Sequence, residues 1–392
     1  MIPVKEAISE VQSTVQSTAD MLMLDLRDSL SYVIAEDVVS PIDMPPFRQS
    51  AMDGYAVNYN GNHEFKLIGE VKAGDSETFD LKAGEAVRIF TGAAVPETSN
   101  AVAIQEYVKQ KNGRIRVDYE IRNGMNIRPQ GEQVKTGDIA LLKGTQVNSA
   151  GIGYLASLGV EMVKVYRKPS VTLLVTGNEL VDPGNDLKYG EIYESNALML
   201  SSALNNTGFS DFEVLRVRDD YSSTLKIIRE ALDSSDFLLV SGGISVGDYD
   251  YVGKALEELN VDKRFYKVRQ KPGKPLFFGK DKESYVFALP GNPASALSCF
   301  YVYVLPALHL FQGNKCFTLN RVRARSRMAF SKKGNRAQFL KAIYYNGQVE
   351  ILEGQNSSML HTFALANALV FIPEDQMETK INDELEVILL PR

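Results

Sequence analysis

Apolar positions near the N-terminus recur at the spacing of helices. Five of them recur in the i, i+3, i+4 pattern of one face of an amphipathic helix: Val4, Ala7, Ile8, Val11 and Val15. Residues 26–36 predict a second helix, after which the chain becomes extended. Pro45 and Pro46 then exclude helix and predict a stiff linker, because proline has no backbone N–H and fixes its own φ.

The pattern changes between about residues 65 and 121, where short alternating runs of apolar and polar residues are separated by turn residues. Such runs are typical of a small all-β domain. Farther on, Asn148 or Ser149 can cap a helix that reaches Leu158, and Gly159 can end it. Because predicted helical pieces flank the β region, we expect them to pack together, with the β region as an insertion joined by two crossings.

From residue 171 onward, predicted apolar strands alternate with predicted helices. Strands are predicted at 171–177, 212–218, 236–243 and 285–291, and helices at 195–206, 222–234 and 250–259. This alternation predicts a parallel sheet with helices on both faces. Short strands return after residue 312 and predict a second β domain.

Together these patterns predict a multidomain α/β plus β fold. Its parts are a three-layer α/β domain with a parallel-type sheet, an inserted small β domain, a helical linker region and a C-terminal β-barrel-like domain. The expected boundaries are 1–45 with 145–168 for the linker region, 46–144 for the inserted domain, 169–314 for the α/β domain and 315–392 for the last domain. A length of 392 residues agrees with roughly two to four domains.

Charge and cysteine content narrow the class of protein. The chain has 43 basic and 49 acidic side chains and a net charge of −6, which argues against nonspecific nucleic-acid binding. Cys299 and Cys316 form no CxxC motif and the three histidines are scattered, so we expect neither a disulfide framework nor a Cys/His zinc site. The charged N-terminus does not resemble a signal peptide. We therefore expect a cytoplasmic protein.

One apolar run, residues 294–311, is nearly uncharged and raises the question of a membrane span. It is interrupted by Pro306 and carries Ser295, Ser298 and His309. It also falls just short of a typical span of about 20 residues. We expect a buried helix or a subunit contact, and no membrane association.

Candidate chemistry gathers between residues 236 and 296. Three apolar strands there each end in a loop rich in Gly, Pro and charged residues. In an open α/β sheet, ligands bind where such loops meet at the carboxyl ends of the strands. Paired glycines and a proline at a first helical turn expose backbone N–H groups that suit an oxyanion or a phosphate. The stretch therefore predicts a pocket for an anion and an acidic cofactor.

Asp248 and Asp250 follow the turn formed by Gly242 and Gly243. Two carboxylates at a strand end, beside phosphate-binding backbone, suit a hard cation such as Mg²⁺. Taken alone, they fit equally well as residues that cap the next helix and favour its dipole.

A Pro-Gly kink farther on is flanked by three lysines: Lys267, Lys271 and Lys274. Lysine carries a compact positive charge that suits an oxyanion. Charge runs usually form a solvated surface, but the prolines hold these lysines in a set geometry, which favours a binding role. In the next turn Asn292 can be the N-cap and Pro293 the first helical residue, as in many helix starts without a ligand. Ser295 can donate to an anion or cap the helix.

Three further polar residues lie beside glycines or at a predicted strand end: Asp53, Thr91 and Glu179. Each of them, considered alone, is more typical of a structural position than of a catalytic one. An Asp before Gly, for example, is ordinary turn chemistry.

The motifs that carry these residues occur together and in a fixed order: PPFRQSAMDGYAV, RIFTGAAVP, SGGISVGDYDYV, QKPGKPLFFG, LPGNPAS and GQNSSMLHTFALANALVFIP. In this order the chain resembles, from end to end, the molybdopterin molybdenumtransferases, the family of bacterial MoeA and the gephyrin E domain. The resemblance implies a four-part subunit with a molybdopterin-binding α/β domain, in an elongated homodimer with a shared active site. The implied reaction takes adenylylated molybdopterin and molybdate with Mg²⁺, releases AMP and leaves molybdenum on the dithiolene.

The resemblance also implies residue roles. One subunit would supply Asp53 and Thr91, and its partner would supply the other catalytic residues: Glu179, Asp248, Asp250, Lys267 and Lys271. Glu179 and Asp250 would be the metal ligands. Molybdate would lie near Lys271, Lys274 and Ser295, with Ser357 or Ser358 reaching in from the last domain. The cofactor-binding set would be Gly242, Gly243, Ser245, Lys274, Pro290, Asn292, Pro293, Ser295 and Ser358.

Two positions depart from the family pattern. Gln133 stands where the family usually has an Asp, and glutamine cannot balance the charge of Mg²⁺. Lys341 stands where the family commonly has an arginine, and lysine lacks the bidentate fork for an oxyanion. Two alternatives stay open: a molybdopterin adenylyltransferase, and a noncatalytic molybdopterin-binding paralogue or scaffold. For the main hypothesis, an adenylyltransferase is the expected substrate donor.

Overall fold

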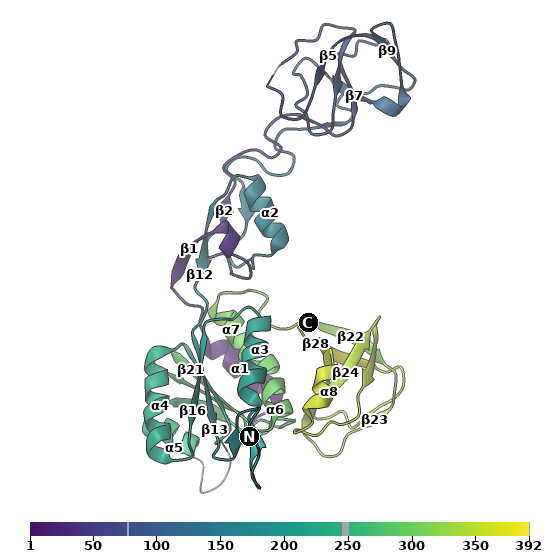
Figure 1. The fold of residues 1–392 in the computed structure, drawn as a ribbon. Coiled ribbons are helices and arrows are strands. Elements are labelled where there is room, and N and C mark those ends of the chain that lie inside the picture. The colour runs from purple at the N-terminus through teal and green to yellow at the C-terminus, as the bar shows by residue number, and fades with distance from the viewer. Residues whose placement is uncertain (77, 245–250, 392) are drawn as a thin grey trace. The chain divides into compact units, whose positions relative to one another are not determined.

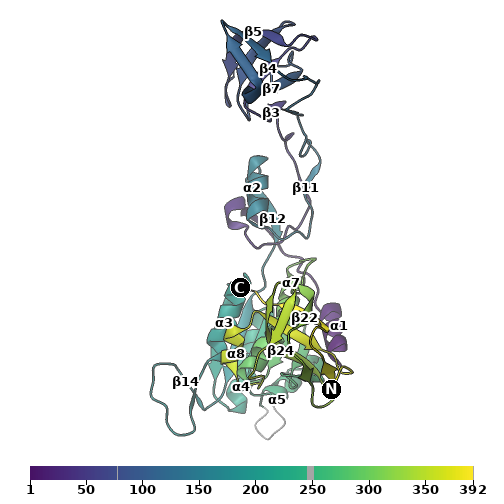
Figure 2. The same ribbon diagram turned by 90° about the vertical axis from the view of Figure 1, so that its right-hand side faces the viewer.

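The computed structural model describes residues 1–76, 78–244 and 251–391. The chain divides into two compact units (Figures 1 and 2). The first comprises Met1–Leu22, Ser31–Val33 and Tyr166–Arg392, and the second comprises Met23–Leu30 and Ile34–Val165. Each unit has hydrophobic clusters of its own.

A mixed sheet forms the centre of the first unit, with the strand order β16-β13-β17-β21-β20-β18. Four neighbouring strands are parallel: β16 (Phe212–Val217), β13 (Val171–Thr176), β17 (Phe237–Ser241) and β21 (Ser284–Leu289). β20 (Phe277–Asp281) runs antiparallel to β21, and β18 (Asp262–Tyr266) runs antiparallel to β20. The parallel part confirms the predicted α/β sheet, and β20 adds an antiparallel strand.

Helices cover both faces of this sheet, because successive strand residues point to opposite sides and both sides are apolar. On β17, Leu239 packs in one cluster, whereas Leu238 and Val240 pack in another. The first cluster includes α1 (Val4–Thr14) and α3 (Asn196–Asn206). The second includes α4 (Tyr221–Ser234) and α5 (Tyr251–Glu258), which lie together on one face in Figure 1. The three-layer prediction is confirmed.

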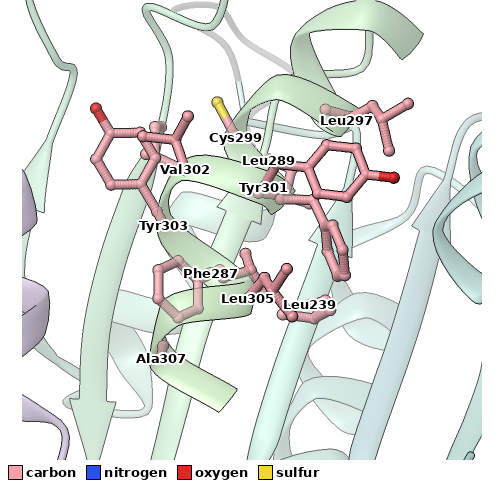
Figure 3. Close-up of a cluster of buried hydrophobic side chains, with 14 of the residues drawn as sticks. Leu239, Phe287, Leu289, Leu297, Cys299, Tyr301, Val302, Tyr303, Leu305 and Ala307 are labelled. Atoms are coloured by element: carbon pink, nitrogen blue, oxygen red, sulfur yellow. The ribbon is translucent and has the colours of Figure 1, made fainter. Parts of the chain in front are cut away.

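The apolar run after residue 292 is one continuous helical segment. It consists of α6 (Pro293–Cys299), the π-helical η3 (Phe300–Val304) and α7 (Leu305–Phe311). Its length and composition would allow a membrane span, but 89% of its apolar window is buried inside the protein. Figure 3 shows its side chains packed beside Leu239, Phe287 and Leu289 of the sheet. The prediction of a buried helix is confirmed.

The last part of the first unit is a closed β barrel. Its strands are β22 (Arg321–Ser326), β24 (Ala337–Tyr345), β25 (Gln348–Ile351), β26 (Ala368–Ile372) and β28 (Glu384–Leu389). They follow the order β24-β25-β22-β28-β26, and β26 pairs back with β24. β19 (Gln270–Lys271) also pairs with β24, in parallel. The barrel is therefore tied directly to the lysine-rich segment.

The second unit contains the predicted inserted β domain. Its sheet has the order β7-β4-β6-β5-β9-β8, with these bounds: β4 (Gly54–Val57), β5 (Glu64–Val71), β6 (Glu85–Ile89), β7 (Ala101–Ile104), β8 (Val108–Lys111) and β9 (Arg114–Val117). The chain enters and leaves this domain along paired segments, since β2 (Val38–Val39) pairs with β11 (Ile139–Leu141). A bridge between Met44 and Val134 continues the pairing.

The predicted helix at 26–36 is wrong. The structure has a single 3-10 turn there, η1 (Leu26–Asp28), because Ser31 takes a left-handed φ of 67° and Ile34 pairs with Val165 as an isolated bridge. The next predicted helix is confirmed as α2 (Ser149–Ser157), capped by the Asn148 side chain. The remaining short elements are β1 (Met21–Asp25), β3 (Gln49–Ser50), η2 (Gln105–Tyr107), β10 (Ile127–Arg128), β12 (Met162–Tyr166), β14 (Leu180–Val181), β15 (Ile192–Tyr193), β23 (Phe330–Ser331), α8 (Leu360–Leu365) and β27 (Glu378–Thr379).

Candidate functional site

A cavity of about 860 Å³ opens in the first unit where several loops meet. The ends of β13, β17 and β21 contribute Gly177, Gly242 and Pro290 to its wall. These strands are parallel, so their carboxyl ends lie at one edge of the sheet. The prediction that the loops gather there is confirmed by the cavity.

The lysine loop, residues 271–275, reaches this edge as predicted, because it follows a strand. It lies between β18, which ends at Tyr266, and β20. Since β18 is antiparallel to β20 and β20 is antiparallel to β21, β18 runs parallel to β21, and its carboxyl end lies at the edge where the other parallel strands end. The lysines therefore join the glycine turns at the carboxyl ends of the strands.

The turn at Gly242 and Gly243 requires glycine for a steric reason. Both residues have left-handed φ angles, of 92° and 64°. A Cβ at Gly242 would lie 2.9 Å from the carbonyl oxygen of Thr176, and one at Gly243 would lie 2.7 Å from the Thr176 hydroxyl oxygen. The turn therefore packs tightly against the end of β13 while lining the cavity.

Lys271 and Lys274 line the cavity and are exposed, whereas Pro272 and Gly273 between them are buried. The loop is held by the buried Gln270, whose side-chain amide donates to the Gly273 carbonyl oxygen at 3.1 Å. The Tyr303 hydroxyl in turn donates to the Gln270 side-chain oxygen. A buried polar network therefore holds the backbone between the two lysines.

Cys299 lies beside this network, 3.5 Å from the Gln270 side-chain nitrogen. Burial raises the pKa of the Cys299 thiol to about 12. The thiol is therefore neutral near pH 7, and it serves as packing rather than as a nucleophile.

Lys267 does not line the cavity. Its ammonium lies 4.6 Å from the centre of the Tyr266 ring, as a cation–π contact. Its backbone N–H donates to the carbonyl oxygen of Leu276, and its carbonyl oxygen accepts from Ile2. The predicted trio of lysines thus separates into two cavity residues and one that lies outside it.

Asn292 occupies the N-cap position of α6, as predicted, but its side chain makes no capping bond. Instead, its amide donates to the Ser357 hydroxyl oxygen at 3.0 Å. The backbone N–H of Ala294 donates to the Ser357 carbonyl oxygen at 3.1 Å. The helix start is thereby joined to a loop of the barrel. Several expected residues line the cavity along this junction: Pro290, Asn292, Pro293, Ser295, Ser357 and Ser358.

Acidic residues on the cavity wall include the predicted Glu179 and the unpredicted Asp219. The Asp219 carboxylate accepts from the backbone N–H of Asn178 at 3.1 Å. Asp219 comes two residues after the end of β16, so the strand-end rule that found Glu179 could have found it too. The expected Ser245, Asp248 and Asp250 lie outside the described residues.

Arg336 also lines the cavity and was not predicted. In the same run of sequence, Lys341 was noted as replacing a family arginine and so losing a bidentate contact to an oxyanion. Lys341 does not line the cavity, because its ammonium donates to backbone carbonyl oxygens inside the barrel domain. The two residues stand five positions apart along an extended chain, which places them on opposite faces.

Asp53 and Thr91 lie in the second unit, where the structure brings them together. The backbone N–H and the hydroxyl of Thr91 both donate to one Asp53 carboxylate oxygen, each at 2.7 Å. These hydrogen bonds, the backbone one first, lower the pKa of the Asp53 carboxyl. Gln133 lies in the same unit, is exposed, and donates its backbone N–H to the Met44 carbonyl oxygen.

Three family models match this chain in sequence order. The MoeA N-terminal region (domain I and II) matches residues 2–159, a probable molybdopterin binding domain matches 172–310, and the MoeA C-terminal region (domain IV) matches 323–390. A molybdopterin molybdenumtransferase of Haemophilus influenzae is 33% identical over 386 residues, covering 96% of this chain and 95% of its own. One from Staphylococcus epidermidis is 30% identical over 400 residues, covering 99% and 95%.

This chain belongs to the molybdopterin molybdenumtransferase family. Two crystal structures of the molybdopterin biosynthesis MoeA protein from Pyrococcus horikoshii agree in fold. One has a TM-score of 0.87 at 29% identity and covers 99% of this chain and 100% of its own. The other has a TM-score of 0.79 at 32% identity and covers 99% of both chains.

Membership in the molybdopterin molybdenumtransferase family also argues against the alternative of a molybdopterin adenylyltransferase. The relatives align along nearly their whole length, including the inserted β domain and the barrel. A lone molybdopterin-binding domain would not require either of those parts. An adenylyltransferase function is therefore not favoured.

Proposed function

We propose that this chain inserts molybdenum from molybdate into adenylylated molybdopterin and releases AMP. The observation that carries the proposal is one cavity that gathers Lys271, Lys274 and Arg336 with serine hydroxyls and the carboxylate of Glu179. It occurs in a chain whose full-length relatives are named molybdopterin molybdenumtransferases. We also propose that the subunit has the four domains whose boundaries were predicted from the sequence.

The cationic side chains explain how two anions could meet. Molybdate carries two negative charges, and the diphosphate of the substrate carries more, so their approach requires neutralisation. Lys271 and Lys274 would act as compact charges on a fixed loop, and Arg336 would add planar donors. The hydroxyls of Ser295, Ser357 and Ser358 can donate to the remaining oxyanion atoms. Groups fixed before the substrate binds stabilise developing charge without having to reorganise.

The carboxylates of the cavity suit a magnesium ion. Mg²⁺ in nucleotide sites usually takes one or two protein carboxylates and completes its shell with phosphate oxygens and water. Glu179 and Asp219 on the cavity wall supply such oxygens, although no group of three His, Cys, Asp or Glu forms a metal site among residues 1–76, 78–244 and 251–391. Bound there, Mg²⁺ would neutralise charge on the diphosphate. The family resemblance adds Asp250 as a second metal ligand and Asp248 as another catalytic carboxylate.

The second unit would complete the site from another subunit. The hydrogen bonds from Thr91 favour the ionised form of Asp53, so its carboxylate can orient water or accept a proton. The same bonds fix the position of the carboxylate within its own unit. We propose a homodimer in which Asp53 and Thr91 of one subunit face the cavity of the other. A cytoplasmic adenylyltransferase would supply the substrate. Lys267 would then contribute charge near the cavity rather than contact the anion.

The test is an AMP-release assay on the purified protein. With adenylylated molybdopterin, molybdate and Mg²⁺, AMP should appear, and omission of molybdate should abolish the release. A folded protein that releases no AMP above buffer contradicts the proposal. Molybdopterin binding without AMP release would indicate a noncatalytic paralogue, and pyrophosphate release from ATP and molybdopterin would indicate an adenylyltransferase.

A further inference from the structure

A loop of the barrel domain, residues 353–359, forms one wall of the cavity. It connects β25 to α8 and contributes Asn356, Ser357 and Ser358. Because Asn292 donates to the Ser357 hydroxyl oxygen, the Ser357 hydroxyl proton is left to donate elsewhere. The position of this loop therefore decides where its serine donors point.

The loop is held from inside the barrel by Lys341, on β24. The side chain is buried, with 3% of the residue exposed. Its ammonium donates to the carbonyl oxygens of Gly354 at 2.8 Å, Asn356 at 3.3 Å and Met359 at 2.8 Å. An ammonium has three N–H donors. All three are directed to the two ends and the middle of this one loop.

The backbone of Lys341 is joined to the same loop through Gln355. The Lys341 N–H donates to the Gln355 side-chain oxygen at 3.0 Å, and the Gln355 amide donates back to the Lys341 carbonyl oxygen at 2.9 Å. The Thr362 hydroxyl contributes contacts to the carbonyl oxygens of Glu353 and Gly354, at 3.2 and 3.1 Å. Gly354 has a left-handed φ of 76° with Thr362 against it, so a larger residue would not fit. Lys341 is the cationic member of this network.

We propose that Lys341 is a positioning residue for oxyanion binding: it fixes loop 353–359 so that Ser357 and Ser358 donate to the anion held by the lysine loop. The nature of the anion rests on the proposed function above. Lys341 itself touches neither substrate, since it lies outside the cavity wall. Without the ammonium, the carbonyl oxygens of Asn356 and Met359 lose this donor and Gly354 keeps only the Thr362 hydroxyl, so the loop is freed to move and bond with water instead.

The same domain offers a matched control in Lys332. This lysine is also 3% exposed, and its ammonium also donates to backbone carbonyl oxygens, those of Pro373 at 2.6 Å and Glu374 at 2.8 Å. Neither acceptor lines the cavity. Loss of this ammonium should therefore disturb the barrel to a similar degree but leave the cavity wall in place.

The experiment compares Lys341→Met, Lys341→Arg and Lys332→Met with the wild type, all as full chains. Molybdate affinity is measured by equilibrium dialysis, KM and kcat by AMP release, and loop order by amide hydrogen exchange. For Lys341→Met, we expect the molybdate Kd and KM to rise about tenfold, the equivalent of one or two hydrogen bonds, with kcat much less affected. Exchange should speed up at 353–359. Lys341→Arg should recover most of the affinity, because a guanidinium also donates to several carbonyl oxygens.

Three results would overturn the inference: wild-type affinity in Lys341→Met, equal loss of affinity in Lys332→Met, or unchanged exchange at 353–359. If the wild type itself binds no molybdate, the proposed function fails, and the exchange measurement alone then decides whether Lys341 orders the loop. A positioning role without an oxyanion would appear as faster exchange confined to that loop in Lys341→Met.

Discussion

The cavity of the first unit and the Asp53–Thr91 pair of the second are built in opposite ways. The cavity draws on strand ends, a lysine loop, a helix start and a barrel loop that are far apart in the sequence. The pair consists of one carboxylate held by the backbone and hydroxyl of one threonine. A composite site depends on each of its supports, whereas a locally bonded pair keeps its geometry alone. The two should therefore respond differently to substitution.

The largest expected effect comes from the lysine loop. Lys271→Ala should lower kcat/KM for molybdate-dependent AMP release by about 100-fold or more, the usual cost of removing a preorganised charge that meets a developing anion. Lys267→Ala should cost far less, because Lys267 lies outside the cavity. If both variants lost kcat/KM equally in the same assay, the distinction between cavity residues and residues outside the cavity would be wrong.

Subunit mixing tests whether the two regions work together. Asp53→Ala should lower AMP release by about 100-fold, the lower end of the usual range for an acid or base, with molybdate affinity unchanged. Mixing it with Lys271→Ala and exchanging subunits should restore about a quarter of wild-type activity, since a mixed dimer keeps one complete site. No recovery after confirmed exchange would contradict a site shared between subunits.

A smaller effect is expected where the barrel meets the helix start. Ser357→Ala removes the hydroxyl that accepts from Asn292. It should raise the KM for molybdate by about three- to tenfold, as expected for loss of one hydrogen bond of about 1 kcal/mol. The stability measured by urea unfolding should change little. A KM equal to that of the wild type would show that the Ser357 hydroxyl lines the cavity without binding molybdate.

The smallest effect concerns the pKa of Asp53. Thr91→Val removes the hydroxyl donor but keeps the backbone N–H, so the Asp53 pKa should rise part of the way toward the ordinary value of about 3.9. Carboxyl NMR titration would measure the rise. Because the folded-state pKa is lowered, the pair stabilises the fold above the ordinary pKa and stops doing so as pH falls through the lowered value. The part of the stability difference between Thr91→Val and wild type that depends on pH should vanish there.

Much of the fold follows from local pattern. Strand and helix periods predicted the parallel sheet, α3, α4 and both β domains, because each element buries a regular face. The helix expected at 26–36 failed where Ser31 turned the chain and Ile34 paired with a distant strand. Such pairing depends on tertiary partners that a local window does not contain.

The site was less predictable than the fold, for a directional reason. The sequence located the strand-end loops, so Glu179, Lys271 and Ser295 were found. It gave no information on which side chains near β24 face the cavity: Arg336 was missed, and the departure at Lys341 was interpreted as the loss of a bidentate oxyanion contact. Nor did it show that the Asn292 side chain turns toward Ser357 rather than capping its own helix.

The pairing of β19 with β24 has a consequence for the design of truncated proteins. A chain that stops after α7 would retain the parallel sheet, yet Gln270 and Lys271 would lose the backbone partners at Ala337 and Gln338. The lysine segment would become a free sheet edge, open to adventitious strand partners. The barrel thus braces a lysine loop that belongs, by sequence, to another domain.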